Sequence, residues 1–428
     1  MKRWRMQGRR LALLIGGLAA WASAGAGELG DLLRSSLAHP AVAARAAAKE
    51  AADRQLDAAR RRTLGAASLV AEAARYEGER FVGVLSPAAL AAMPFSRDLA
   101  RYGVAYQLPV DLAGTIAAAR RAAQSDLEAA RLAERQAALL KLHDTASAYV
   151  RLQALLHQVQ VLKVQQERVE QTIERVQREV EIGQAAVVDL RLAESEQARL
   201  HSEQTRLQAA IEEALTALEE ASGQRQLPSE TLSAAPAWPE GGAEGALPLG
   251  LAQARAEAQA ARAEEARRQL WPAFSLGADY FQFDSGALPP DTWTLSARVS
   301  LPIDPAAWAR ADAARAQARA AREEREAARR DVARQWAALR SAYDTARADA
   351  EALKQEIAAR EEVVRVQAEL LRVGMAPMEE FLRQQRDLRE AEARGTEARA
   401  RALIAWSAAQ VLLGTPVERY IEILESVR

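Results

Sequence analysis

Two stretches decide the fold: RVQREVEIG (175–183) continuing into VVDLRLAESEQARL (187–200), and ELLRVGMAPMEEFLRQQRDL (369–388). In each, a helical pattern ends at a glycine, Gly183 or Gly374, and a second helical pattern begins a few residues later. The two glycines lie 191 residues apart, and the motifs LPVD (108–111) and LPID (301–304) lie 193 residues apart. Two unlike motifs at nearly one spacing indicate a tandem duplication of a helical hairpin.

The helix before the first turn carries a heptad pattern. Its apolar residues follow steps of three and four, with only Gln166 interrupting, which predicts a left-handed coiled coil. Leu200, Leu207, Ile211 and Leu218 continue such a pattern on the returning helix. No proline stands between Leu112 and Ile182, so this helix can extend over about 70 residues, roughly 105 Å. A cytosolic coiled-coil rod would share these features, so the rest of the chain must decide.

The N-terminus has the features of a secretory signal over residues 1–24. Basic residues precede a short apolar run from Leu11 to Ala20, and small residues follow that allow cleavage after Ala24 or Ala26. The apolar run is shorter than the about 18–20 residues of a membrane-spanning helix, and no later stretch has the character of one. We therefore expect an exported protein.

Composition excludes several classes. The 428 residues carry a net charge of −1, which gives no support for a nucleic-acid partner. The chain has no cysteine, which excludes disulfides, thiolate metal sites and a lipidated N-terminal cysteine.

Between the helical stretches the pattern changes to strand alternation. Every second residue from Tyr102 to Val110 is apolar or aromatic: Tyr102, Val104, Tyr106, Leu108 and Val110. In the clearest strand, Leu295, Val299 and Leu301 fall on one face and Ser296, Arg298 and Ser300 on the other. Alternation over about ten residues with aromatics near the strand ends is typical of transmembrane β-barrel strands. Soluble hairpins with one wet face give the same alternation, and the signal peptide favours the barrel.

We therefore divide the chain into two similar halves of a mainly α protein with a small transmembrane β part. After the signal peptide, the first half comprises N-terminal helices (25–66), a strand pair (67–111) with a loop over 77–99, and a helical hairpin (112–222). A connector (223–248), rich in Pro, Gly and Ser, separates it from the second half. That half comprises a helix (249–272), a strand pair (273–304), a second hairpin (305–415) and a C-terminal tail (416–428).

Four strands cannot close a barrel, and strand edges exposed to lipid would leave backbone groups unpaired. Strands must therefore be pooled between chains. Two chains would supply eight strands and three would supply twelve, and this argument alone leaves both open.

The ordered set of motifs resembles the TolC family of outer-membrane efflux channel proteins. The family pattern after the hairpin turn, Asp-Val-Leu-x-Ala, is similar to Asp189-Leu190 with Ala193 and to Glu380-Phe381-Leu382, and the family's strand end is similar to 108–111 and 301–304. His39 replaces an asparagine common in the family, and Gln384 an alanine. The short chain and the LPID motif favour the heavy-metal-efflux (CzcC-like) branch.

This resemblance implies a homotrimer with one twelve-stranded barrel in the lipid of the outer membrane and a long periplasmic α-helical barrel. It also implies a tripartite efflux system that exports drugs or metal ions, with a periplasmic adaptor protein and an inner-membrane pump as partners. The connector would form a belt around the tunnel. The adaptor would dock at the hairpin tips, Gly183, Gln184, Ala185, Gly374, Met375 and Ala376.

The resemblance also implies a periplasmic gate, because acidic residues after the second turn ring the narrow end of the family's tunnel. Glu380 is the sixth residue after Gly374 and Arg383 the ninth, and Asp189 holds the sixth place after Gly183. Arg383 would offset the carboxylate charge and tie neighbouring chains. Glu380 and Arg383 are equally well explained as ordinary solvated charges.

No catalytic, cofactor or metal site is evident. His39, His143, His157 and His201 share no metal-ligand spacing, and the carboxylates lie beside arginines at helical spacing, which we interpret as solvated faces. We expect no enzyme and no cofactor. The alternative functions are a periplasmic adaptor, which normally has one hairpin in a β-rich chain, and a coiled-coil scaffold, which would not need the alternating strands.

Overall fold

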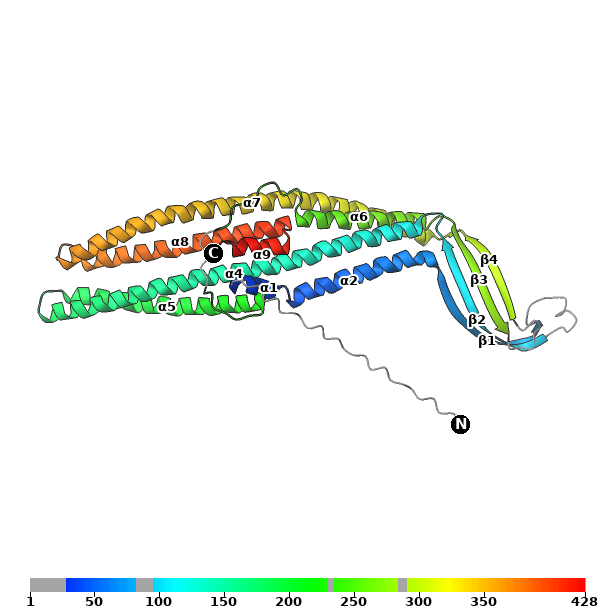
Figure 1. The fold of residues 1–428 in the computed structure, drawn as a ribbon, viewed down its shortest axis with the longest axis horizontal. Helices are drawn as coiled ribbons and strands as arrows, with labels where there is room; N and C mark the ends of the chain where they lie inside the picture. The colour runs from blue at the N-terminus through cyan, green and yellow to red at the C-terminus, as the bar shows by residue number, and fades with distance from the viewer. Residues whose placement is uncertain (1–27, 82–94, 230–234, 284–290, 428) are drawn as a thin grey trace, which may run out of the picture.

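The computed structural model describes residues 28–81, 95–229, 235–283 and 291–427. The molecule is elongated, with the two helical hairpin tips at one end and a β-sheet at the other (Figure 1). The predicted order of helix, two strands, long helix, turn and helix is confirmed in both halves. In the described part of the chain, no helix has the length and apolar character needed to cross a membrane.

The first half begins with α1 (Glu28–Ser36) and α2 (Pro40–Arg61), which are separated by a break at His39. Its hairpin consists of α4 (Thr115–Glu181), 67 residues and about 100 Å long, and α5 (Val187–Ser222). The heptad positions Leu162 and Val169 of α4 are buried against Leu200 of α5. Gln166, which interrupts the apolar pattern, donates a hydrogen bond from Nε2 to Gln204 of α5 at 3.1 Å. The interruption is therefore a satisfied polar pair within the coiled coil.

The second half repeats this design. It consists of α6 (Leu247–Arg268), α7 (Pro305–Arg372) with 68 residues, and α8 (Met378–Leu413) with 36 residues, the length of α5. Asp304 caps α7 by accepting a hydrogen bond from the Ala306 amide at 2.9 Å. In the first half, Asp111 binds the amides of Ile116 and Ala117 at 3.0 and 2.9 Å. Each strand-end aspartate thus serves as the N-terminal anchor of the long helix that follows.

The four strands form one antiparallel sheet in the order β1-β2-β3-β4, with β1 at Ala66–Phe81, β2 at Phe95–Val110, β3 at Ala273–Phe283 and β4 at Asp291–Ser300. The predicted loop over 77–99 is wrong at both ends, because β1 extends to Phe81 and β2 begins at Phe95; residues 82–94 lie outside the described residues. Leu301, which we placed on the fourth strand, follows the end of β4.

A single large core lies midway along the rods. It joins α1, α4, α5 and α8 to a helix α9 (Val417–Glu425), whose Tyr420, Ile421 and Leu424 are buried. The connector is fixed to the same region, since Trp406 Nε1 donates to Ala237 O at 3.1 Å and Tyr343 OH donates to Pro236 O at 2.7 Å. The terminal segment, which we described only as a tail, is thus a helix that closes this core.

Candidate functional site

The sheet has one apolar and one polar face. Registered rows run straight across the four strands, so residues in one row share a face. One row is Leu69–Val104–Tyr280–Trp293, and the adjacent row on the opposite face is Ser68–Ala105–Asp279–Thr294. The apolar residues are solvent-exposed in the single chain, with Leu69 at 88% and Trp293 and Leu295 at 72%. An exposed apolar face of this size indicates a surface that lies in lipid or against protein.

The polar face carries a charge pair and an aromatic ring. Arg101 of β2 contacts Glu72 of β1, with Nε to Oε2 at 2.7 Å, and its guanidinium lies 4.9 Å from the centre of the Phe281 ring of β3. Gly103 permits this packing, because a Cβ there would lie 1.9 Å from the Tyr280 carbonyl oxygen. Both charges of this ion pair therefore lie on the polar face of the sheet, opposite the apolar rows.

Both outer strands of the sheet, β1 and β4, have one unpaired edge in the described chain. A strand needs about 9–11 residues to cross a bilayer, and the segment Tyr102–Val110 of β2 is long enough. Unpaired edge amides in hydrocarbon would each cost several kcal/mol. The sheet therefore needs further strands at both edges to enter a membrane.

At the other end of the molecule, the two hairpin turns have the same geometry. Gly183 and Gly374 have φ of 73° and 75°. In the first turn the Gly183 amide donates to Val180 O at 3.0 Å, and the Gln184 amide to Glu179 O at 2.7 Å. The second turn repeats both bonds with Gly374 and Met375 as donors, at 3.1 and 2.8 Å. This is the Schellman termination, in which glycine is preferred for its left-handed conformation.

The tips expose apolar side chains. Met375 is 78% exposed, Gln184 is exposed, and Ala185 packs partly against a cluster that includes Val176 and Phe381. Four further apolar residues at the tips are exposed and were not among the predicted site residues: Ile182, Val187, Val188 and Val373. From the sequence, apolar residues in a heptad pattern are expected to be buried in a coiled coil. Only the closeness of these four residues to the turns could have predicted that they are exposed.

Glu380 and Arg383 form an ion pair on the first turns of α8, with Arg383 Nη2 2.7 Å from Glu380 Oε1. Gln384 also donates to this carboxylate at 2.7 Å. The hydrogen bond from Arg383 is the main cause that lowers the pKa of Glu380, so this carboxylate keeps its charge in mildly acidic solution. Asp189, half-buried on the first turn of α5, makes no ion pair with them in the described structure.

One set of charges corrects the sequence interpretation that the carboxylates lie on solvated faces. Glu196 of α5 is 5% exposed and lies 3.1 Å from Arg199 and 3.3 Å from Arg386 of α8. Arg389 of α8 is also buried, pairs with Glu203 at 3.2 Å, and has its pKa lowered by burial. These charges have the same spacing as surface pairs, but α5 and α8 close over them and join the two hairpins.

The histidines do not come together. His39 caps α2, with Nδ1 accepting from the Ala41 amide at 3.1 Å. His143 lies 2.7 Å from Ser407, whose hydroxyl lies 2.5 Å from the buried Tyr420 hydroxyl. Among the described residues, no group of three or more metal-ligating side chains is placed to hold an ion.

Solved structures share this architecture. A membrane protein from Pseudomonas aeruginosa matches with a TM-score of 0.79 and 20% identity over 91% of this chain and 93% of its own. The outer membrane protein VceC from Vibrio cholerae matches at 0.77 and 19% identity, over 90% and 96%. The CmeC outer membrane channel of Campylobacter jejuni matches at 0.77 and 14% identity, over 93% and 89%. At these identities the likeness establishes the fold.

A search of curated proteins finds no match. The family model described as outer membrane efflux protein matches residues 33–224 and 246–415, and so includes both hairpins and all four strands. The heavy-metal-efflux branch is not assigned by these comparisons and stays a prediction. With its duplicated hairpins and two-faced sheet inside the matched residues, this chain belongs to the outer membrane efflux protein family.

Proposed function

We propose that three copies of this chain form the outer-membrane channel of a tripartite efflux system, in which the twelve pooled strands close a barrel. The observation that carries the proposal is the sheet with one apolar face, one polar face and two open edges. Pairing β4 of one chain with β1 of the next satisfies both edges and directs the apolar rows to lipid. Twelve strands enclose a water-filled path, whereas an eight-stranded barrel is filled by side chains.

In the proposed assembly, the rods extend into the periplasm and close around the same axis. The hairpin tips contact a periplasmic adaptor protein, which connects the channel to an inner-membrane pump. The exposed apolar residues beside Gly183 and Gly374 support this contact, because such residues at a rod end are a surface for a partner. The cargo is a small solute, drug or metal ion, and the chain acts as a conduit rather than an enzyme.

We also propose that Glu380 and Arg383, together with Asp189 on the neighbouring hairpin, form the periplasmic gate. Three copies of the Glu380–Arg383 pair would meet at the narrow end of the tunnel. Carboxylates alone would repel at that distance, and the arginines allow bidentate contacts between chains.

Engineered disulfides test the assembly, since the chain has no cysteine of its own. Each variant carries Val70→Cys on β1 together with one substitution on β4: Thr292→Cys, Thr294→Cys or Ser296→Cys. All four positions lie on the polar face of the sheet. We expect oxidation of outer membranes to give a dimer and trimer ladder for the pair in register. Ala105→Cys with Asp279→Cys is the matched control, because these residues are partners within one chain and should give no ladder. Cross-linked monomers alone in the β1–β4 series would contradict the proposed trimer.

A further inference from the structure

A groove of about 1000 Å³ lies midway along the rods, lined by α4, α7 and α8 of a single chain. Its walls are largely apolar, with Leu155, Leu339 and Ile404 among alanines, and Arg151 and Arg401 stand among its polar residues. Since all three helices come from one chain, the groove needs no neighbouring copy to form it.

The groove opens on the side of α8 that faces away from the connector. Ile404 lines the groove, whereas Trp406 donates to the connector carbonyl of Ala237 at 3.1 Å. Residues two apart on a helix point in nearly opposite directions. Ile404 also stands at the end of a heptad series with Arg383, Glu390 and Glu397, and residues seven apart in a coiled coil share a face. The groove therefore shares the face of the proposed gate residue Arg383, which is the tunnel side in the proposed channel.

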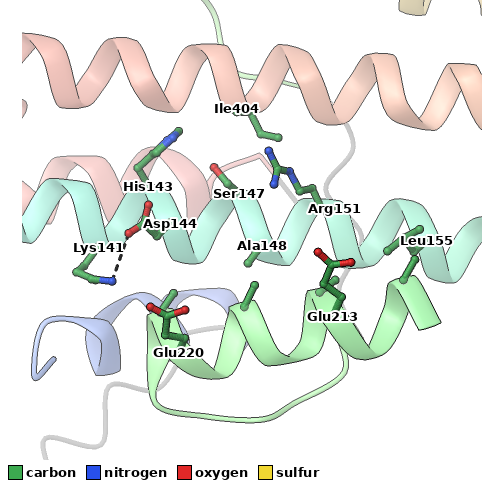
Figure 2. Close-up of a pocket in the computed structure, with 14 residues that line it drawn as sticks. Lys141, His143, Asp144, Ser147, Ala148, Arg151, Leu155, Glu213, Glu220 and Ile404 are labelled. Carbon is green, nitrogen blue, oxygen red and sulfur yellow. Dashed lines mark ion pairs between the residues drawn. The ribbon is translucent and has the colours of Figure 1, made fainter. Parts of the chain in front are cut away.

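A second cavity of about 490 Å³ adjoins the groove, and Arg151, Leu155 and Ile404 line both. Figure 2 shows Arg151 directing its guanidinium from α4 toward Ile404 of α8, with Ser147 beside it. Arg151 has no hydrogen-bond or ion-pair partner among the described residues. The Ser147 hydroxyl is also without a partner there, although the residue is only 8% exposed. The unpaired buried hydroxyl of Ser147 indicates that a polar group can be accommodated at this end of the apolar groove. The exposed guanidinium of Arg151 beside it is available to a ligand in the groove.

We infer that this groove is a binding site on the transport path for small amphiphilic anions, with the anionic group at Arg151 and Ser147 and the apolar body along Leu155, Leu339 and Ile404. The inference rests on the proposed channel, for which it names a solute class. Arg151, beside the unpaired Ser147 hydroxyl, supports an anionic group at this end of the groove. Arg401 is already paired with Asp349 at 3.6 Å, which leaves Arg151 as the unpaired cation of the groove. Glu397 accepts from the neutral amide of Gln158 at 3.3 Å and keeps its charge, but Gln158 lies seven residues, about two helical turns, from Arg151 on α4.

Carboxylates of the second cavity favour the competing outcome, in which the site binds cations. Glu213 and Glu220 of α5 line the second cavity, together with the ion pair Lys141–Asp144 at 3.4 Å. If these carboxylates dominated, the site would select amphiphilic cations instead. A pair of probes that share one aromatic body but differ in charge separates the two outcomes.

The test is equilibrium binding to the purified full-length protein, with 2-naphthalenesulfonate as the anion and 2-naphthylmethylammonium as the cation. Detergent alone provides the blank. We expect saturable binding of the anion and at least tenfold weaker binding of the cation. Arg151→Gln should weaken anion binding about tenfold, the loss of one charge-assisted contact, and Ala342→Trp should remove it by filling the groove. Arg419→Gln on the exposed face of α9 is the control and should bind as the wild type.

Stronger binding of the cation, unchanged affinity in Arg151→Gln, or no saturable binding of the anion would each overturn the inference. Both variants are checked first for heat-modifiable trimers, so that a folding defect is not mistaken for lost binding. A protein that gives the disulfide ladder described above but does not bind naphthalenesulfonate refutes the groove and leaves the proposed channel standing.

Discussion

A charge placed on the apolar face of β4 should cost stability according to its depth in the bilayer. The register gives the depth: Val299 lies in the row of Val110 and Phe274 next to the helices. Counting only the rows of the apolar face, Leu295 lies two rows farther along the strand and Trp293 lies in the row after it. Leu295 is therefore near the middle of the apolar rows. An arginine at the midplane of a barrel costs about 2–4 kcal/mol, and the cost falls to about 0–1 kcal/mol near the interface.

For Leu295→Arg this cost lowers the folding equilibrium of each chain by roughly 30-fold to 1000-fold. The assay is the yield of heat-modifiable trimer in purified outer membranes at equal expression. We expect little trimer for Leu295→Arg, an intermediate yield for Val299→Arg, and a yield near that of the wild type for Ser296→Arg on the polar face. Equal yields for Leu295→Arg and Ser296→Arg would show that this face does not contact lipid.

Three further predictions concern the rods. Bulky substitutions at Met375, such as Met375→Trp, should leave the trimer intact and abolish efflux in cells, and efflux at the wild-type rate would remove this position from the proposed adaptor contact. Arg383→Ala should raise the conductance of the purified trimer at rest, because the Glu380 carboxylate loses its ion pair and hydrogen bond; unchanged conductance would exclude it from the gate. Burial lowers the pKa of His143 in the folded protein, so the unfolded chain binds more protons and stability should fall as pH drops from about 6.5 toward the lowered value. His143→Gln should flatten that decline in thermal melts, whereas His201→Gln on the exposed surface of α5 should not.

The sequence predicted the long helices and their turns because each rests on a local signal. A heptad pattern without proline fixes α4, and a glycine after the last heptad position fixes the turn, as the hydrogen bonds at Gly183 and Gly374 confirm. The sheet was predicted from alternation, but the ends of β1 and β2 were not. The polar residues at the end of β1 resemble a loop in sequence. Arg80 pairs with Ser96 of β2, whereas Glu77 lies in a register irregularity between Arg75 and Arg80.

The charges between the hairpins could not be predicted for a different reason. Glu196 and Arg199 are three residues apart and look like an exposed ion pair, and Arg386 and Arg389 of α8 look like ordinary surface cations. Only the packing of α5 against α8 shows that Glu196 and Arg389 are buried among these charges. Removing one partner of a buried pair typically costs about 3–5 kcal/mol, because the remaining charge is left buried and unpaired. We therefore expect substitutions of Glu196 to be destabilising, although its sequence spacing resembles that of an ordinary surface residue.

The two hairpins share one turn but have different residues just beyond it. The sixth position after each glycine is acidic, Asp189 or Glu380, whereas the ninth is Leu192 in the first hairpin and Arg383 in the second. Leu192 packs into the apolar cluster at the tips, and Arg383 is 61% exposed and pairs with Glu380. Because the backbone of the turn is the same in both repeats, the difference lies in what each helix faces. At this position the first hairpin places Leu192 in the apolar cluster, whereas the second hairpin exposes the charge of Arg383 to solvent.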